Sequence, residues 1–287
     1  MGTLLIAGPL ALDDHPEHPR LIGGVGGYAA IAAAPLAPTQ LWCRGGIDIT
    51  HQMKDLLEKR HIDLAGVAWE GPTPRGSASG FVAGGSLLPI DMEPTSADGL
   101  GGALLIGLPP DEMRRALRVI TALPDGEKRI LIVSPRPADL ADLNFRRELL
   151  AVTDVLVLSA SKALSLTGET SALGAAQALQ AEGAKAVVLT ASQLGGLISY
   201  QGKATTYPAL PVPALDKLGV SAAFPGALAA WIAGTGRCDF STLKRGCAMA
   251  SGVAGICAQG IGPKKLLQAN RDDYMERFNR LRRDQKY

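Results

Sequence analysis

Residues 216–228 read Asp-Lys-Leu-Gly-Val-Ser-Ala-Ala-Phe-Pro-Gly-Ala-Leu, and this stretch decides the fold. It leaves a strand, turns at Gly219 and opens an apolar, alanine-rich helix. The first turn of a helix carries backbone N–H groups without intrahelical partners and the positive end of the helix dipole, so it can hold an anion. An ordinary strand-to-helix turn is the alternative when the stretch is taken alone, and the rest of the chain must decide between the two interpretations.

From residue 103 onward, short apolar runs alternate with helical patterns. This rhythm predicts a mostly parallel sheet covered by helices on both faces, an α/β protein. A hairpin around Gly202 is expected after it, followed by two alanine-rich helices and a charged helical tail from Asn270. The expected strands are 103–108, 130–133, 155–158, 186–189, 197–200 and 205–207; the expected helices are 111–123, 143–152, 172–182, 222–233 and 243–258.

The N-terminal part continues the same architecture. Strands are expected over 4–7 and 41–43, with helices over 28–34 and over 51–60, where Met53, Leu56 and Leu57 share one face. Residues 10–21 look like a loop or edge excursion, and 66–99 break into short pieces punctuated by Gly, Pro and Ser. We therefore expect one domain over 1–287, with lid segments at about 9–22 and 66–99.

Composition narrows the possible classes of function. The 287 residues carry 29 Lys and Arg against 27 Asp and Glu, a balance that argues against a dedicated nucleic-acid binder. No apolar run reaches the ~18–20 residues of a membrane span, and the first residues lack the basic region of a signal peptide. Four cysteines without a CxxC pair and four scattered histidines predict no metal site. A soluble, cytoplasmic protein is expected, with no nucleic-acid or membrane partner.

The stretch at 216–228 resembles the signature of the pfkB carbohydrate kinase (ribokinase-like) family, Asp-x-x-Gly-Ala-Gly-Asp-x-Phe-x-Gly-Ala. The resemblance implies a three-layer ribokinase-like fold with a small β lid, and an anion hole at Gly219, Val220, Ser221 and Ala222. In the family, the last of these positions is the Asp that deprotonates the acceptor hydroxyl. Ala222 cannot accept a proton, and loss of a positioned general base typically costs ~10²–10⁴-fold in rate.

The resemblance also implies a substrate side. Asp13, with Asp14 beside it, matches the acid that binds sugar hydroxyls, although a solvated loop acid is the alternative. The run Gly23-Gly24-Val25-Gly26-Gly27-Tyr28 matches the family's double-glycine motif, with Tyr28 in place of the usual Asn. A dinucleotide fingerprint is rejected there because only Leu21-Ile22 precedes it. Arg75 is a candidate for an anionic substrate group, or else an exposed lid arginine.

The nucleotide side departs from the family in two further places. The family's Asn-x-x-Glu, which organises Mg²⁺, reads Ser159-Ala160-Ser161-Lys162, so that a lysine replaces the glutamate. The first glycine of the family's nucleotide loop is Ser192. The alternative is that Lys162 contacts phosphate directly and partly replaces the metal. These nucleotide-side positions all depart from the family pattern, whereas the positions around them still match it.

The resulting expectation is a pseudokinase that binds a sugar, a nucleoside or a partner protein, with negligible phosphotransfer and no assured cofactor. Its lid sheet suggests a homodimer. The alternative is an active carbohydrate or nucleoside kinase that uses ATP, Mg²⁺ and a non-standard base, either Asp216 or Asp13. A third interpretation is a purely structural subunit without a ligand.

Overall fold

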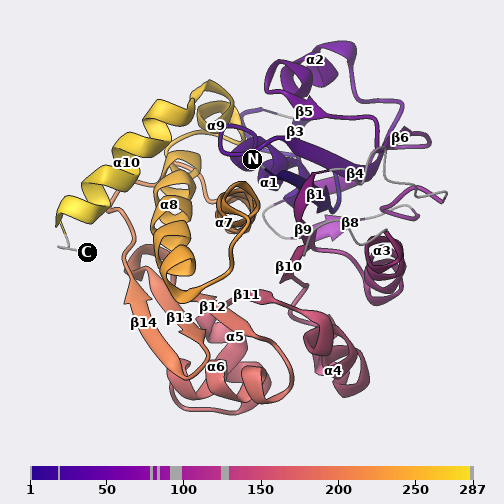
Figure 1. Cartoon of the computed structure of the whole chain (residues 1–287). Helices are drawn as coiled ribbons and strands as arrows, with labels where there is room; N and C mark the ends of the chain where they lie inside the picture. Colours follow the sequence, from indigo (N-terminus) through magenta and orange to yellow (C-terminus); the bar gives the residue numbers. More distant parts are fainter. Residues whose placement is uncertain are drawn as a thin grey trace.

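The computed structural model describes residues 2–18, 20–77, 80–82, 85–90, 99–123 and 129–284 (Figure 1). Its strands are β1 (Thr3–Ala7), β2 (Ala11–Asp13), β3 (Leu21–Gly23), β4 (Thr39–Gly45), β5 (Ile62–Asp63), β6 (Val67–Trp69), β7 (Arg75–Ser77), β8 (Gly80–Val82), β9 (Leu100–Ile106), β10 (Ile130–Ser134), β11 (Val155–Ser159), β12 (Ala186–Thr190), β13 (Gly196–Tyr200) and β14 (Lys203–Tyr207). Its α-helices are α1 (Gly24–Ala33), α2 (His51–Lys59), α3 (Pro110–Ala122), α4 (Leu143–Val152), α5 (Ala160–Thr167), α6 (Ala172–Ala181), α7 (Val220–Thr235), α8 (Phe240–Ala258), α9 (Lys264–Gln268) and α10 (Arg271–Asp284).

Ten strands form the central sheet, in the order β14-β13-β12-β11-β10-β9-β1-β4-β5, with β6 also paired to β4. The strands from β12 to β5 along this order run parallel, and the β13–β14 hairpin adds antiparallel strands at one edge. The mostly parallel sheet and the hairpin are confirmed.

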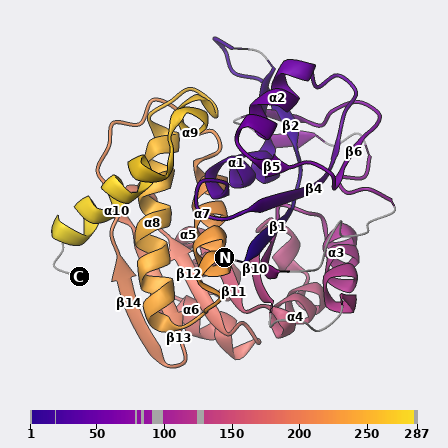
Figure 2. The ribbon, with the colours of Figure 1, turned by 45° about the horizontal axis from the view of Figure 1, so that its top comes forward.

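Successive side chains of the central strands point alternately into two separate hydrophobic cores. Leu4 and Ile6 of β1 face the side covered by α1, α7 and α8, whereas Leu5 and Ala7 face the side covered by α3, α4, α5 and α6. Because both faces are apolar, the strands have no polar side to expose, as expected for a parallel sheet between two helical layers. Figures 1 and 2 show the two sets of helices on opposite sides of the sheet.

A second, four-stranded sheet has the order β3-β2-β7-β8. The expected loop over 10–21 is wrong at both ends, because Ala11–Asp13 and Leu21–Gly23 pair as antiparallel strands. The strands β2 and β7 pair in parallel whereas β7 and β8 pair antiparallel, so the small sheet is mixed. Val67–Trp69 pairs instead with β4 of the central sheet.

Two helices have no counterpart in the expectations, namely α5 and the short α9. Leu56 of α2 is 42% exposed, so it does not share the buried face with Leu57. Three of the four free cysteines are buried, and Cys238 is half-buried, in agreement with their expected role as small apolar side chains. Among the described residues, no helix has the length and apolarity needed to cross a membrane.

Candidate functional site

A cavity of about 800 Å³ lies at the carboxyl ends of the parallel strands. Its lining includes Ile106 at the end of β9, Ser134 at the end of β10, Ser159 at the end of β11 and Thr190 at the end of β12. The carboxyl edge of an open parallel sheet is the usual place for a ligand in α/β proteins. The topology therefore places this cavity where the sheet offers its binding edge.

The opposite wall comes from the segment before α7 and from two helices. Val212, Ala214 and Lys217 line it from the segment, Val220, Ser221 and Phe224 from α7, and Ser251, Ala254 and Ala258 from α8. Most of these side chains are apolar. The polar lining consists largely of hydroxyl groups, from Ser134, Ser159, Ser161, Thr190, Ser192, Tyr207, Ser221 and Ser251, together with Gln193.

The charged side chains of the lining are both cationic. Arg136 already makes a two-pronged ion pair with Asp139, at 2.6 and 2.9 Å, whereas Lys217 is exposed at the cavity. No Asp or Glu appears among the described residues that line the cavity. Proteins usually hold Mg²⁺ through one or two carboxylates together with substrate phosphates, and the described lining offers hydroxyl groups but no carboxylate for that role. The described residues also contain no cluster of three His, Cys, Asp or Glu side chains able to hold a metal.

The turn before α7 is built on Gly219, which has φ +77°. The N–H groups of Ala222 and Ala223 both donate to the Gly219 carbonyl oxygen, at 3.0 and 2.8 Å, and the Val220 N–H donates to the Lys217 carbonyl oxygen at 3.4 Å. The bonds from Val220 and Ala222 use two of the four amides expected in the anion hole, whereas the Ala223 bond is an ordinary intrahelical bond. Ala222 itself is fully buried and does not line the cavity.

Asp216 holds this turn in place. One carboxylate oxygen accepts a hydrogen bond from the Leu218 N–H at 2.9 Å, and the other accepts one from the Gly262 N–H at 2.9 Å. Asp216 therefore joins the start of α7 to the loop before α9. Both oxygens are occupied by backbone donors, which weighs against the use of Asp216 as a base.

Asp13 is only 3% exposed, so the alternative of a solvated loop acid is wrong. One of its carboxylate oxygens accepts a hydrogen bond from the Gly24 N–H at 3.2 Å. Burial raises the pKa of Asp13; the Gly24 bond opposes that rise, and the nearby charges of Asp14 and Asp216 add to it. Asp14 is exposed and does not share this environment.

Tyr28 covers the same region from α1 and is 1% exposed. A Cβ atom built at Gly219 would lie 2.1–2.4 Å from three atoms of the Tyr28 ring, and one built at Gly23 would lie 2.9 Å from its edge. The ring is therefore in direct contact with both glycine turns. Neither Asp13 nor Tyr28 lines the 800 Å³ cavity, so these two residues expected on the substrate side lie outside the cavity that contains Ser159 and Ser192 of the expected nucleotide side.

Of the other residues expected on the nucleotide side, some line the cavity and one does not. Ser159 and Ser192 line the cavity, and Ser192 keeps a left-handed backbone (φ +53°) at the position where the family resemblance has glycine. Lys162 is exposed on α5 and does not line the cavity, which removes the support for a direct phosphate contact.

Arg75 is engaged in the small sheet and not directed at the cavity. It pairs with Asp48 at 3.2 Å, and Asp48 also accepts hydrogen bonds from the Thr73 N–H at 2.8 Å and from the Thr73 hydroxyl. Burial raises the pKa of Asp48, but the Thr73 bonds and the Arg75 charge outweigh it and leave that pKa lowered. Arg75 thus forms an ion pair with a carboxylate whose pKa is lowered.

Sequence reasoning missed Arg136, Lys217 and Ser251 as lining residues. Arg136 follows β10 directly, so its place after a parallel strand was a signal that could have found it. Lys217 lies in the stretch 216–228 but matches no defined residue of the family signature. Ser251 lies in the middle of α8, and nothing in its local sequence separates it from an ordinary helix residue.

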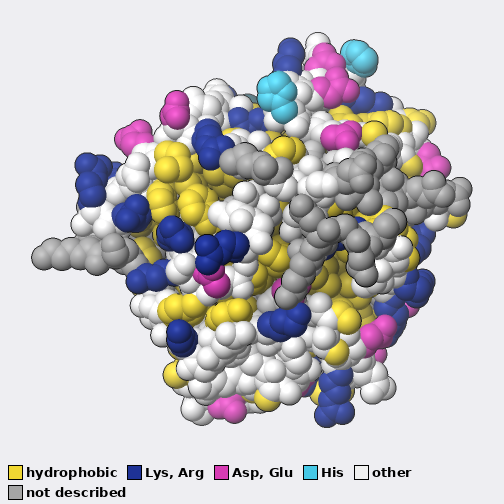
Figure 3. Space-filling view, viewed as in Figure 1, with side chains coloured by type: hydrophobic (Ala, Val, Ile, Leu, Met, Phe, Trp, Pro, Cys, Tyr) yellow, Lys and Arg dark blue, Asp and Glu magenta, His cyan; other side chains and the backbone are white. Residues whose placement is uncertain are grey.

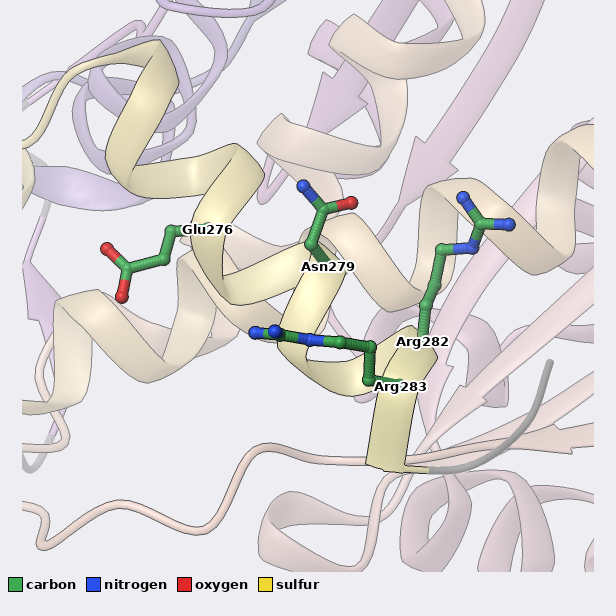
Figure 4. A pocket seen from close by; sticks show the side chains of 4 residues that line it. All are labelled: Glu276, Asn279, Arg282 and Arg283. Atoms are coloured by element: carbon green, nitrogen blue, oxygen red, sulfur yellow. The ribbon is translucent and has the colours of Figure 1, made fainter.

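A smaller concavity of about 460 Å³ lies along α10, beside Glu276, Asn279, Arg282 and Arg283. Figure 4 shows that all four side chains come from this one helix and spread away from it in different directions. They do not converge on a common point, and the space-filling view shows Lys and Arg side chains scattered over this left-hand side of the molecule (Figure 3). We assign no chemistry to it.

No protein-family model matches the sequence, and no curated protein matches it. Several solved structures are similar to it in fold over nearly the whole chain. A double mutant of fructokinase from Vibrio cholerae O395, bound to fructose, ADP and potassium ion, is 17% identical with a TM-score of 0.80, over 97% of this chain and 98% of that one. Aminoimidazole riboside kinase from Salmonella enterica, complexed with aminoimidazole riboside and an ATP analog, is 13% identical with a TM-score of 0.75, over 96% and 99%. Ribokinase from Arabidopsis thaliana, complexed with ribose and ATP, is 18% identical with a TM-score of 0.75, over 96% and 98%. The chain therefore has the ribokinase-like fold, as the resemblance at residues 216–228 predicts.

Proposed function

We propose that this chain is a binding protein on a kinase scaffold, which holds a small organic ligand in the 800 Å³ cavity and transfers no phosphoryl group at a useful rate. One observation carries the proposal: the cavity lining described contains no carboxylate. The buried Ala222 at the position expected for the base agrees with it. Phosphoryl transfer depends on metal support and on a positioned base, so the loss of both is severe.

The chemistry of the lining supports a ligand that binds without a metal. Its hydroxyl groups suit a polar edge of the ligand, its apolar wall suits an aromatic or aliphatic face, and Lys217 suits an anionic end. Adenine nucleotides are the natural first probes, because the structurally similar fructokinase and ribokinase were solved with ADP and ATP. Binding that does not require Mg²⁺ is the distinguishing expectation.

An active kinase is the second candidate, and Asp13 is the observation that favours it. Its burial and raised pKa are properties of a carboxylate that acts as a general base nearer to neutral pH. A phosphotransfer assay with Asp13→Asn decides this case. A structural subunit, the third candidate, is expected to show no stabilisation by any small molecule.

The test is a calorimetric titration with ADP and ATP, once with EDTA and once with Mg²⁺. Equal affinity in both conditions is expected, together with no ADP production from ATP in the presence of fructose or ribose. Lys217→Ala is expected to weaken ADP binding about tenfold or more, since a hydrogen bond to a charged group contributes roughly 1.5–3 kcal/mol. Lys203→Ala, at an exposed lysine of β14 outside the cavity, is the matched control.

Binding that requires Mg²⁺, or steady turnover of ATP, would overturn the proposal in favour of the active kinase. A thermal-shift panel gives a second readout, because a ligand at about 100 times its dissociation constant adds roughly 2.7 kcal/mol of stability. No shift with any nucleotide, nucleoside or sugar would favour the structural subunit instead.

We further propose a homodimer through the small sheet, whose edge strands are β3 and β8. An unpaired strand edge offers N–H and C=O groups to a second copy. Sedimentation velocity over a range of protein concentrations tests this, and a monomer throughout the range would contradict it.

A further inference from the structure

The charged groups of the cavity of about 800 Å³ limit the kind of ligand that it can hold, a limit that deepens the proposed function and rests on it. Two cationic side chains line the cavity, and Arg136 is already bound to Asp139 at 2.6 and 2.9 Å. Lys217 forms no ion pair with any residue that the structure describes. The described lining also contains no carboxylate that could hold a metal ion between several phosphates. It thus offers one free cation to an anionic ligand.

The start of α7 adds a donor for the same anionic group. Ser221 lines the cavity in the first turn of this helix, and its N–H has no backbone partner among the described residues. The N–H groups of Val220 and Ala222 on either side are used within the turn, at 3.4 and 3.0 Å. One unpaired N–H at a helix start and one ammonium group suit a single phosphate or carboxylate. Each further phosphate would bring negative charge for which the described lining offers no second free cation.

Another part of the lining is apolar. The helices α7 and α8 lie side by side (Figures 1 and 2), and they contribute Phe224 and Ala254 to a wall that Val212 continues. Tyr207 stacks on Phe224 with ring centroids 5.5 Å apart, and its hydroxyl donates to the Leu189 carbonyl oxygen at 3.2 Å, so that donor is already used. A wall of apolar and aromatic side chains suits the face of a flat ring.

Ser251 places one buried polar group in this wall. It lies in the middle of α8, lines the cavity and is 7% exposed. Its hydroxyl forms no hydrogen bond with any residue in the described part of the chain. Native proteins rarely leave a buried hydroxyl without a partner. The Ser251 hydroxyl is therefore free to pair with a polar atom of a ring that covers the wall, such as a ring nitrogen.

We propose that the cavity selects a heteroaromatic ring that carries a single anionic group, and that it discriminates against polyphosphates. Lys217 and Ser221 hold the anionic group, and Ser251 pairs with the ring. A nucleoside monophosphate and a heteroaromatic carboxylate share this chemistry. The number of anionic groups then decides which nucleotide the cavity binds most tightly.

The test is a series of ligands that differ only in the number of phosphates, namely adenosine, AMP, ADP and ATP, titrated by calorimetry in EDTA and again with Mg²⁺. AMP is expected to bind about tenfold more tightly than adenosine, because its phosphate meets the Lys217 ammonium group. ADP and ATP are expected to bind no more tightly than AMP. Indole-3-acetate, a heteroaromatic carboxylate, is titrated beside them. Binding of AMP alone, or of indole-3-acetate alone, supports the proposal and identifies which source of the shared chemistry the cavity accepts.

Two variants separate the two ends of the ligand. Lys217→Ala is expected to weaken AMP binding to the level of adenosine and to leave adenosine binding unchanged. Ser251→Ala is expected to weaken adenosine and AMP by the same factor, about threefold to tenfold. Its melting temperature is expected to equal or exceed that of the wild type, because the hydroxyl that it removes has no partner in the folded protein. Lys203→Ala, at an exposed lysine outside the cavity, is expected to change none of these affinities.

ADP or ATP that binds more tightly than AMP in EDTA overturns the limit to one anionic group and leaves the proposed function standing. An AMP preference that remains in Lys217→Ala overturns it in the same way. Binding that requires Mg²⁺ overturns the proposed function and this inference together, so the two failures are distinguishable. No binding of any of these ligands, with or without Mg²⁺, also overturns both.

Discussion

Gly219 must be glycine for two reasons that can be separated. Its backbone has φ +77°, a left-handed conformation that costs a residue with a side chain roughly 1–2 kcal/mol. Its Cα also lies against the Tyr28 ring, which leaves no room for a methyl group. Gly236, at the other end of α7, shares the first constraint (φ +63°) but has no atom within 4 Å of an added Cβ.

These two glycines therefore form a matched pair. Gly236→Ala is expected to lower the free energy of unfolding by about 1 kcal/mol, the backbone cost alone. Gly219→Ala is expected to lower it by about 2–4 kcal/mol, because overpacking adds a further 1–3 kcal/mol. Urea unfolding measures both. Equal losses in the two variants would show that Tyr28 does not lie against the turn as described.

Single residues also show what sequence can and cannot predict about the site. The resemblance points to Asp13 and Ser192 as site positions, which stays a prediction, and it leaves the burial of Asp13 open. Burial depends on Gly23, Gly76 and Tyr28, which come from three different elements. Such convergence is a tertiary property, and no local pattern contains it.

At the scale of elements, helix α8 begins with a charged cap. One Asp239 carboxylate oxygen accepts hydrogen bonds from the Thr242 N–H at 2.8 Å and from the Ser241 hydroxyl at 2.9 Å. The backbone bond contributes most to lowering the pKa of Asp239 to about 2, and the Ser241 bond and Arg237 add to it. Helix α6 has an uncharged cap instead, because the Ser171 hydroxyl accepts from the Gly174 N–H at 3.0 Å.

The two caps predict different responses to pH. Asp239→Ala is expected to cost about 1 kcal/mol of stability at pH 7, the usual value for an N-cap. Because the folded pKa lies below the unfolded value of about 3.9, this contribution is complete above pH 4–5 and disappears as pH falls toward 2. Ser171→Ala is expected to cost a similar amount independently of pH. Urea unfolding of both variants at pH 7 and pH 3 checks this, and a constant cost for Asp239→Ala would contradict it.

Elements were predictable where apolar runs alternate with helical patterns along the sequence. The strands β10, β11 and β12 are short apolar runs between helical patterns, and they were placed within one residue at each end. By contrast, β2 and β3 have three residues each, too few to show alternation, and they exist because they pair with each other and with β7. Helix α5 was not predicted because it starts directly after β11, without a loop between the strand and the helix.

At the scale of the whole molecule, the chain has the ribokinase-like fold, but only some of the residues expected near a reacting phosphate and sugar lie in the cavity. The cavity contains Ser159, Ser192 and Lys217, whereas Asp13, Tyr28 and Ala222 are buried outside it. A reaction between ligands on the two sides would need an open path between them. In the described structure Tyr28 and the turn at Gly219 occupy the space beside Asp13.

An aspartate at position 222, where the family resemblance expects the base, tests whether one substitution or several separate this chain from an active kinase. With the rest of a kinase site intact, Ala222→Asp would be expected to raise ATP-dependent phosphorylation of fructose or ribose by ~10²–10⁴-fold. We expect no such gain, and none in Ala222→Asp/Tyr28→Ala either, because the cavity lining described offers no carboxylate to support Mg²⁺. Ala223→Asp is the matched control, since Ala223 is also fully buried on α7 and bears the same cost of burying a carboxylate. The rate of ADP release is measured on folded variants, verified by circular dichroism. A hundredfold higher rate in Ala222→Asp than in Ala223→Asp would mean that a single substitution had silenced an otherwise complete kinase.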